Sequence, residues 1–277
     1  MAERVKLDIQ GGVAHVRLAR GDKMNALDPA MFEALADTGE KLEVNTELRA
    51  VVLSGEGRAF CAGMDMSSFA AMAESTGEPL DIMGRTHGLA NIWQHAAWLW
   101  RELPVPVIAA LHGVAFGGGL QVALGADLRY AAPGTRLSIM EIKWGLVPDM
   151  SGTQLLRHLA RDDAVRELTY TGREFSAEEA LSLGLVTRVC EDPLAAAMET
   201  ARQIARRNPD AIRAAKRLFN AAPYLGAQDG LLMESEEQAR ILGSPNQREA
   251  VLATMQKREP AFAFQASKSS DTDQRSR

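Results

Sequence analysis

The first twenty residues alternate between polar and apolar positions in two short runs. RVKLDIQ and VAHVRLA flank the pair Gly11 and Gly12, and this period of two predicts a β-hairpin. Asp28 and Pro29 then open a helical pattern through AMFEALADTGEKLE, with aspartate as the cap and proline in the first turn. The apolar run LRAVVLSG, residues 48–55, ends in glycine and is typical of a buried strand.

A strand, a glycine-rich turn and a helix occur twice, around residues 50–70 and 105–125. GRAFCAGMDM and a helical region with Trp93, Trp98 and Trp100 follow the first strand. PVPVIAALHG forms the second strand and is followed by a glycine-rich helix start. The repetition indicates an α/β protein built as a spiral of stacked ββα units more than a two-layer doubly wound sheet.

The pattern is almost entirely helical from about residue 151. It includes SAEE, which resembles a capping box, NPDAIRAAKRLF, and the long stretch EEQARILGSPNQREAVLATMQKR. The final SKSSDTDQRSR is polar throughout, which is typical of a disordered tail. These patterns predict a core over residues 1–198, a C-terminal helical region over 199–264 and a tail over 265–277.

Composition narrows the class of protein. With 277 residues and 46% hydrophobic content, the chain can bury a large core. Its net charge of −5 argues against a nucleic-acid partner. Cys61 and Cys190 are far apart and lack metal-ligand spacing, which fits a reducing compartment. The start MAERVKLDIQ has no apolar signal region, and proline, histidine and glycine interrupt the longest apolar stretch. We therefore expect a cytoplasmic protein without a membrane partner.

The glycine run in HGVAFGGGLQ requires a reason, because glycine destabilises a helix relative to alanine. Gly117, Gly118 and Gly119 stand directly between a strand and a helix. The first N–H groups of a helix are unpaired and lie at the positive end of its dipole, so a glycine-lined helix start suits an anion or a developing oxyanion. A tight packing turn is the alternative, and it explains three glycines in succession less well.

Four motifs then carry a resemblance to a known family: KMNAL (23–27), AFCAGMDM (59–66), HGVAFGGGL (112–120), and EIKWGLVPDMSGTQLL (141–156) followed by LTYTGREFSAEEALSLGLV (168–186). In order and spacing the chain resembles the enoyl-CoA hydratase/isomerase, or crotonase, superfamily over residues 3 to 262. The resemblance implies a spiral of ββα units and an acyl-CoA thioester as substrate. It also implies C-terminal helices at the subunit contacts of a homotrimer or a dimer of trimers.

The resemblance also assigns the binding groups. The backbone N–H groups of Met64 and Gly118 would grip the thioester oxygen, which stabilises an enolate. Coenzyme A would contact KMNAL and the loop 62–66, through Lys23, Met24, Ala26, Ala62, Asp65 and Met66. Lys23 could meet a phosphate, although a lysine before a helix can equally be an ordinary solvated side chain.

The carboxylates distinguish the possible reactions. Hydratases of this family hold a water between two glutamates, and Glu141 matches the second of them. Gln121 stands at the first position; its amide can orient a water or a substrate but cannot exchange a proton. Asp149 matches an acidic residue of the dienoyl-CoA isomerase branch, where it joins the glutamate in moving a proton. Its other interpretation is a charge at a helix N-terminus.

We therefore expect double-bond isomerisation of an unsaturated acyl-CoA, with hydration of a 2-enoyl-CoA as the second possibility. A hydrolase or dehalogenase-like branch, with Asp149 as nucleophile, is the third; retention of Glu141 counts against it. Two alternatives are not enzymes: a non-catalytic acyl-CoA-binding module and an RNA-binding relative. The presence of Glu141 and Asp149 argues against a non-catalytic module, and the negative net charge argues against RNA binding.

The remaining candidates are weaker. Cys61 has the character of a small core residue, since nothing near it would lower the pKa of its thiol. His15 and His112 are interpreted as structural, whereas His95, among the tryptophans, keeps a possible role near the acyl pocket. Residues 67–85 would line that pocket but carry no readable pattern. The sequence has no HExxH, CxxC, P-loop or dinucleotide motif, so we expect no metal and no cofactor other than the substrate's coenzyme A.

Overall fold

A six-stranded sheet forms the centre of the computed structural model, which describes residues 3–67 and 81–263. The predicted hairpin is confirmed: β1 (Val5–Gln10) and β2 (Val13–Leu18) pair antiparallel. β2 then pairs in parallel with β3 (Ala50–Gly55), and β4 (Val107–Leu111), β6 (Leu128–Ala131) and β9 (Arg188–Val189) extend the sheet in parallel. Its spatial order is β1-β2-β3-β4-β6-β9.

Three short strands make a second sheet in the order β5-β7-β8. β5 (Val114–Phe116) lies parallel to β7 (Arg136–Ser138), and β8 (Phe175–Ser176) pairs with β7 antiparallel. β5 follows β4 after a two-residue bend, so the chain leaves the large sheet and joins the small one directly before the glycine run. Residues 116–121 therefore directly follow the point at which the chain changes from one sheet to the other.

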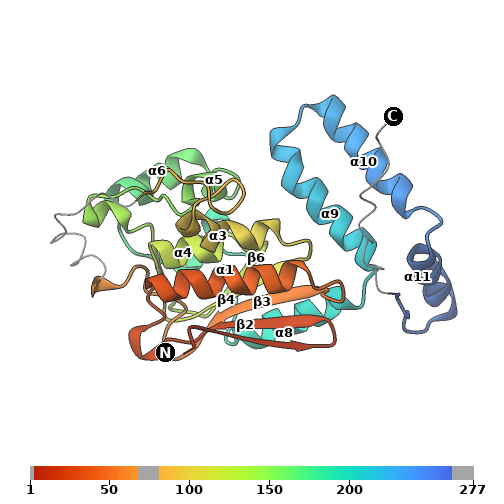
Figure 1. Ribbon diagram of the computed structural model, residues 1–277, viewed down its shortest axis with the longest axis horizontal. Coiled ribbons are helices and arrows are strands. Elements are labelled where there is room, and N and C mark those ends of the chain that lie inside the picture. Colours follow the sequence, from red (N-terminus) through yellow and green to blue (C-terminus); the bar gives the residue numbers. More distant parts are fainter. Residues whose placement is uncertain (1–2, 68–80, 264–277) are drawn as a thin grey trace, which may run out of the picture.

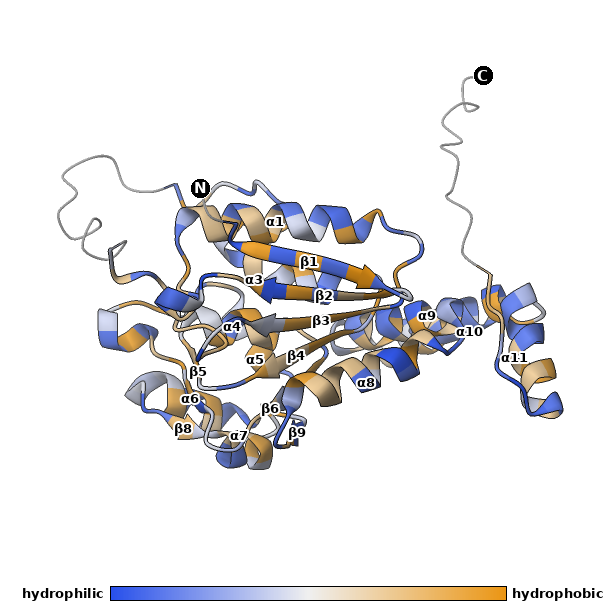
Figure 2. Ribbon diagram, turned by 90° about the horizontal axis from the view of Figure 1, so that it is seen from below, coloured by the Kyte–Doolittle hydropathy of each residue, from blue (hydrophilic) through white to orange (hydrophobic). Residues whose placement is uncertain are grey.

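Helices cover both faces of the large sheet, as Figures 1 and 2 show. Val51 and Leu53 of β3 point to the main core, where α1 (Pro29–Glu43), α3 (Ile92–Glu102) and α4 (Gly118–Leu124) pack. Ala50 and Val52 point to the opposite face, which α8 (Pro193–Ala205) covers through Ala197 and other small residues. This alternation follows from the two-residue period of a strand.

Side-chain caps set where the main-face helices begin. Asp28 accepts a hydrogen bond from the Met31 N–H at the start of α1, as predicted. Asn91 and Gln94 form a reciprocal capping box at the start of α3. The predicted strand 48–55, the tryptophan-bearing helix and the strand within PVPVIAALHG are likewise confirmed.

The chain after residue 151 is mainly helical, as predicted. Besides α8, the helices are α5 (Gly152–Leu156), α6 (Asp162–Thr171), α7 (Ala177–Leu183), α9 (Pro209–Ala221), η3 (Ala222–Tyr224), α10 (Ala227–Ile241) and α11 (Pro245–Gln256). The long stretch EEQARILGSPNQREAVLATMQKR is divided between α10 and α11, because Gly243 has a left-handed backbone and Pro245 begins a new helix.

α9 and α10 form an antiparallel pair that extends away from the sheet, with α11 beyond it (Figure 1). The boundary predicted between residues 198 and 199 falls inside α8, which packs on the sheet along its length. The division into a core and an oligomerisation region stays a prediction, and the predicted tail 265–277 lies outside the described residues. Over the described ranges, no helix is long and apolar enough to span a membrane.

Candidate active site

A pocket of about 490 Å³ opens where the loops after β3 and β4 meet the start of α4. Residues of η1 (Gly21–Lys23), of η2 (Glu141–Trp144) and of the segment before α5 complete its wall. The residues that the resemblance assigned to catalysis and to coenzyme A binding line this pocket: Lys23, Met24, Ala26, Ala62, Met64, Asp65, Met66, Gly118, Gln121, Glu141 and Asp149. Segments separated by more than a hundred residues in the chain therefore share one site.

Backbone pairing holds the first two motifs side by side. The Ala62 N–H donates to the Met24 carbonyl, and the Leu27 N–H donates to the Gly63 carbonyl. The loop also reaches the glycine-rich helix start: a Cβ added to Gly63 would lie 2.7 Å from the Phe116 carbonyl oxygen and 3.8 Å from the Gly118 nitrogen. Glycine at position 63 is therefore required for the close approach of the two loops.

Met64 and Gly118 supply the two predicted backbone donors. Within residues 3–67 and 81–263, the N–H groups of Met64 and Gly118 have no backbone acceptor, and both residues line the pocket. The neighbouring N–H group of Asp65 behaves differently, since it donates to the Leu27 carbonyl. The pocket can thus offer two fixed donors to one oxygen atom, one of them at a helix start.

Structural reasons account for two of the three glycines, which changes the sequence-based interpretation of the run. Gly117 has a positive φ of 49°, which an L side chain adopts with strain. A Cβ on Gly119 would lie 2.5 Å from the Cys61 carbonyl oxygen. The left-handed backbone therefore favours glycine at 117, and packing requires it at 119. At Gly118 the nearest atom to an added Cβ is the flexible sulfur of Met150, at 2.6 Å, so close approach of a ligand remains a reason for glycine there.

Gln121 and Glu141 form a hydrogen-bonded pair at the back of the pocket. Gln121 lies on α4 and is 2% exposed, and Glu141 begins η2 and is 8% exposed. The Gln121 Nε2 donates to Glu141 Oε1 over 2.6 Å, and the Gly152 N–H donates to Gln121 Oε1 over 2.9 Å. The other oxygen, Glu141 Oε2, is buried and has no hydrogen-bond partner within the described part of the chain.

Burial raises the pKa of the Glu141 carboxyl, and the charge of Asp149 raises it further, against the hydrogen bond from Gln121. Desolvation also raises the pKa of Asp149, although this residue is exposed at the mouth of the pocket. Two carboxyl groups with raised pKa values thus share one cavity. A raised pKa brings a carboxyl group closer to the range in which it can both accept and return a proton.

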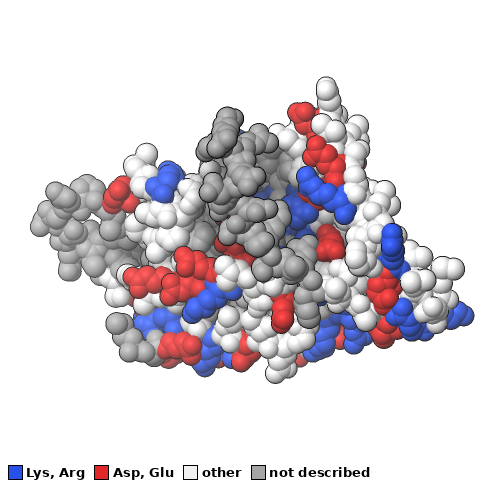
Figure 3. Space-filling view, turned by 45° about the vertical axis from the view of Figure 1, so that its right-hand side comes forward, with Lys and Arg blue, Asp and Glu red and all other residues white. Residues whose placement is uncertain are grey.

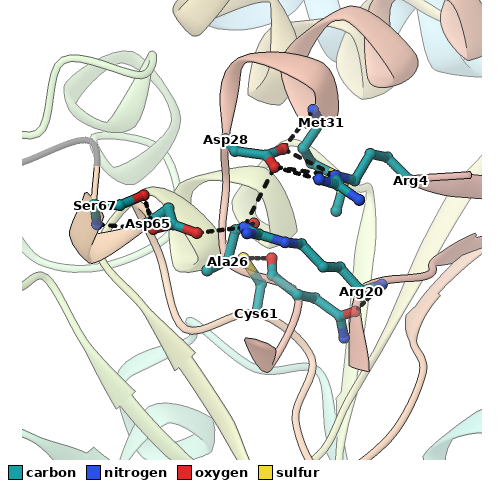
Figure 4. A network of polar contacts seen from close by, with 9 residues as sticks. Arg4, Arg20, Ala26, Asp28, Met31, Cys61, Asp65 and Ser67 are labelled. Atoms are coloured by element: carbon teal, nitrogen blue, oxygen red, sulfur yellow. Dashed lines mark hydrogen bonds and ion pairs between the residues drawn. The ribbon is translucent and has the colours of Figure 1, made fainter. Parts of the chain in front are cut away.

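An ion network fixes the loop that carries Met64 (Figure 4). Arg20 donates to Asp65 Oδ2 at 2.5 Å and to the Ala26 carbonyl at 3.0 Å, while Asp65 Oδ1 accepts the N–H and the hydroxyl of Ser67. The Ser67 hydrogen bonds, followed by Arg20, lower the pKa of Asp65 to about 2. The Asp65 carboxylate is therefore engaged within the protein, and its predicted contact with coenzyme A stays a prediction.

Replacing Asp65 with asparagine should lower the free energy of unfolding by roughly 1 to 3 kcal/mol, because Arg20 loses a charged partner. A depressed carboxyl pKa stabilises the folded state above the unfolded value and loses that effect as pH falls toward 2. Urea titrations of the wild type should therefore show this loss at acid pH, and those of Asp65→Asn should not. Asp229→Asn, at an exposed position, is the control. Equal stability of the two variants at pH 7 would contradict this role.

Sequence reasoning missed several residues of the pocket and its support. Asn25 is fully buried and donates to the carbonyls of Glu56, Ala59 and Phe60, holding the two motifs together. It lies inside KMNAL, so the motif itself was the available signal. Ser67 lines the pocket as expected for the stretch 67–85, of which 68–80 lie outside the described residues, and Gly117 of the glycine run lines it as well. The lining residues that sequence reasoning did not name are Asp22, Arg58, Gly63, Phe116, Met140, Trp144, Leu146 and Met150. Five of these eight lie inside a quoted motif, and Asp22, Arg58 and Met140 directly precede one.

Cysteine and histidine lie where the sequence indicated, with one exception. Cys61 is fully buried, and burial raises the pKa of its thiol to about 12. His15 bonds Ser54, and His112 bonds the Gly57 carbonyl. His95 does not line the pocket; its half-buried ring stacks on His87 with centroids 4.7 Å apart. No three His, Cys, Asp or Glu side chains of the described ranges are grouped to hold a metal ion.

Known proteins resemble this chain over most of its length. Residues 8–265 match the family model described as enoyl-CoA hydratase/isomerase. The short-chain-enoyl-CoA hydratase of Clostridium acetobutylicum is 30% identical over 92% of this chain and 95% of its own. The mitochondrial Delta(3,5)-Delta(2,4)-dienoyl-CoA isomerase of Mus musculus is 34% identical over 75% of this chain and 65% of its own.

A solved structure gives the same result for the fold. The enoyl-CoA hydratase from Bacillus anthracis superposes with a TM-score of 0.84 at 30% identity, covering 94% of this chain and 98% of that one. The α/β class and the crotonase-like spiral expected from the sequence are therefore confirmed.

Proposed function

We propose, for a chain that belongs to the enoyl-CoA hydratase/isomerase family, that it shifts a double bond of an unsaturated acyl-CoA. The backbone N–H groups of Met64 and Gly118 form an oxyanion hole for the thioester oxygen. One carboxylate removes a proton from the acyl chain, an enolate forms as the double bond moves, and a carboxylic acid returns a proton at another carbon. The substrate and the product then have the same composition.

The shared location of Glu141 and Asp149 carries this proposal. Both carboxyl groups line the pocket that Met64 and Gly118 also line, and the N–H groups of these two residues have no backbone acceptor among the described residues. Burial raises the pKa of each, which brings the proton affinity closer to what reversible transfer at neutral pH requires. A dienoyl-CoA isomerase among the relatives supports a dienoyl thioester as the substrate class.

Hydration of a 2-enoyl-CoA is the second candidate, and the relative named short-chain-enoyl-CoA hydratase favours it. Gln121 Nε2 has two N–H groups and donates one of them to Glu141. The other could hold a water for addition. Glu141 would then act as the only proton-transfer group beside that water, and Asp149 would serve only as a charge before α5.

The proposed partner is the acyl-CoA itself, without a separate cofactor, metal or nucleic acid. Lys23 and Arg58 are exposed cations at the edge of the pocket and can attract the phosphates of coenzyme A. On the face drawn in Figure 3, acidic and basic side chains lie side by side, as expected for a protein with a net charge of −5. This mixture does not favour a polyanion.

Assembly as a homotrimer or a dimer of trimers also belongs to the proposal. Large apolar side chains of the C-terminal helices are exposed in the single chain, among them Phe219, Leu231, Leu232 and Met255. Burial between subunits would remove them from water. Cys61 and Cys190 are free thiols, which supports assignment to the cytoplasm.

Replacement of Asp149 with asparagine tests the proposal. Loss of one proton-transfer group should lower kcat on dienoyl-CoA by about a hundredfold or more, whereas Gln121→Ala should cost about tenfold. Asp229→Asn is the matched control. Under the hydratase mechanism the order reverses, with Gln121→Ala severe and Asp149→Asn close to the wild type. A steady-state assay of the three variants on dienoyl-CoA and 2-enoyl-CoA therefore separates the two reactions.

A further inference from the structure

We infer that Gln121 is a positioning residue that fixes the orientation of the Glu141 carboxylate and assigns proton transfer to its Oε2 atom. The inference deepens the proposed function and rests on it. The inference is based on the two hydrogen bonds of the buried Gln121 side-chain amide. Neither Gln121 nor Gly152 takes up a proton during the reaction.

The Gly152 N–H fixes which way the amide faces. A backbone N–H can only donate, so the Gln121 atom 2.9 Å from it is the oxygen Oε1. The nitrogen Nε2 must then face Glu141 Oε1, at 2.6 Å. Gln121 and Gly152 are both buried, so water cannot readily replace either partner.

The donor at Glu141 Oε1 leaves a single oxygen for the proton. An N–H group repels a second hydrogen at the same oxygen, so the neutral acid carries its proton on Oε2. Oε2 is buried and lacks a partner among the described residues, and Glu141 lines the pocket. A buried acceptor without a partner costs free energy unless a ligand or water satisfies it, which is consistent with a substrate C–H or an ordered water meeting this atom.

Gly152 also helps to orient the Glu141 carboxylate. A Cβ at position 152 would overlap Gln121 Oε1 and would lie 2.8 Å from Gln121 Cδ and 3.1 Å from Pro148 Cβ. A side chain there would push the amide away from Glu141. Gly152 therefore orients the Gln121 amide, and the Gln121 amide in turn orients the Glu141 carboxylate. Gly152 and Gln121 are 31 residues apart in the chain.

Gln121→Met tests the inference, because methionine has a similar length but cannot donate. We expect kcat on dienoyl-CoA to fall about tenfold at nearly constant KM, since a hydrogen bond to a charged group is lost. The acid limb of the pH profile should also move to higher pH, because Gln121 lowers the pKa of Glu141. Charged groups on the same pocket, Asp22, Lys23, Arg58, Asp65 and Asp149, are unchanged in this variant. Gln154→Met, on the exposed face of α5, is the control.

The Glu141 carboxyl can also be titrated by carbon NMR, with Glu141→Gln assigning its signal. A raised pKa in Gln121→Met supports the inference even if dienoyl-CoA is not isomerised, so failure of the proposed function is recognised separately. If Gln121→Met lowered the Tm but left both the acid limb of the pH profile and the Glu141 titration as in the wild type, the inference would be wrong. Gly152→Ala should shift the limb in the same direction, and the double variant should be no worse than Gln121→Met alone.

Gln121→Glu keeps an acceptor for the Gly152 N–H and replaces Gln121→Met if methionine prevents folding. Its second oxygen would face Glu141 Oε1 at hydrogen-bond distance, so the two carboxyl groups should share a proton and titrate in two separated steps. A Glu141 signal that titrates as in the wild type would contradict the inferred contact.

Discussion

Glu141→Gln should lose nearly all turnover, about a hundredfold to ten-thousandfold in kcat. Glutamine has the shape of the glutamate but cannot take or return a proton. In the proposed mechanism the buried Oε2 of Glu141 accepts the proton, and the amide of the variant cannot replace it in that role. Substrate binding should change little, because the two backbone donors are untouched. Steady-state kinetics on dienoyl-CoA measures the loss, with Glu191→Gln, an exposed position, as the matched control.

The pH dependence adds a second criterion. A general base works when it is deprotonated, and burial raises the pKa of Glu141 above the ordinary glutamate value. In the wild type, kcat/KM should therefore rise with pH through a limb that lies above pH 4.5. The residual activity of Glu141→Gln should lack that limb. If Glu141→Gln kept substantial activity and the same rise of kcat/KM with pH, Glu141 would not be the proton-transfer group.

Gly118→Val should abolish measurable isomerisation with little loss of stability. The valine side chain would occupy the space beside Met150 and block the thioester oxygen from the Met64 and Gly118 N–H groups. Loss of an oxyanion donor costs about a hundredfold or more in rate. The Met150 side chain can move, so the fold should survive the substitution.

Tm and turnover should be measured together for this variant. Gly230→Val is the matched control, since nothing lies within 4 Å of a Cβ at that position of α10. A Gly118→Val protein that keeps both its Tm and its activity would show that close approach at Gly118 is not needed. A smaller side chain, as in Gly118→Ala, should give an intermediate loss.

Local patterns predicted most of the fold because each depends on near neighbours in the chain. The hairpin at Gly11 and Gly12, the Asp28 cap and the strand 48–55 follow from two-residue alternation, capping chemistry and apolar runs. Gly243 and Pro245 also mark the division between α10 and α11 locally. The stretch as a whole predicted a single helical pattern, because the residues on both sides of the division are strongly helical.

The motifs predicted the residues of the candidate site. They did not predict the tertiary contacts that hold these residues in place. The eleven predicted residues meet in one pocket, but the reason for Gly119 is its contact with Cys61, on a segment 58 residues away. The bond between Gly152 and Gln121 and the Arg20–Asp65 ion pair likewise join distant segments. Such contacts arise from the path of the chain through both sheets, which no local pattern encodes.

The most direct measurement incubates the purified protein with dienoyl-CoA and 2-enoyl-CoA thioesters of graded chain length and analyses the products by mass and by ultraviolet absorbance. Isomerisation through Glu141 and Asp149 predicts a dienoyl product of unchanged mass with a shifted double bond. A product that has gained one water from 2-enoyl-CoA, without double-bond migration in any dienoyl-CoA, would contradict the account.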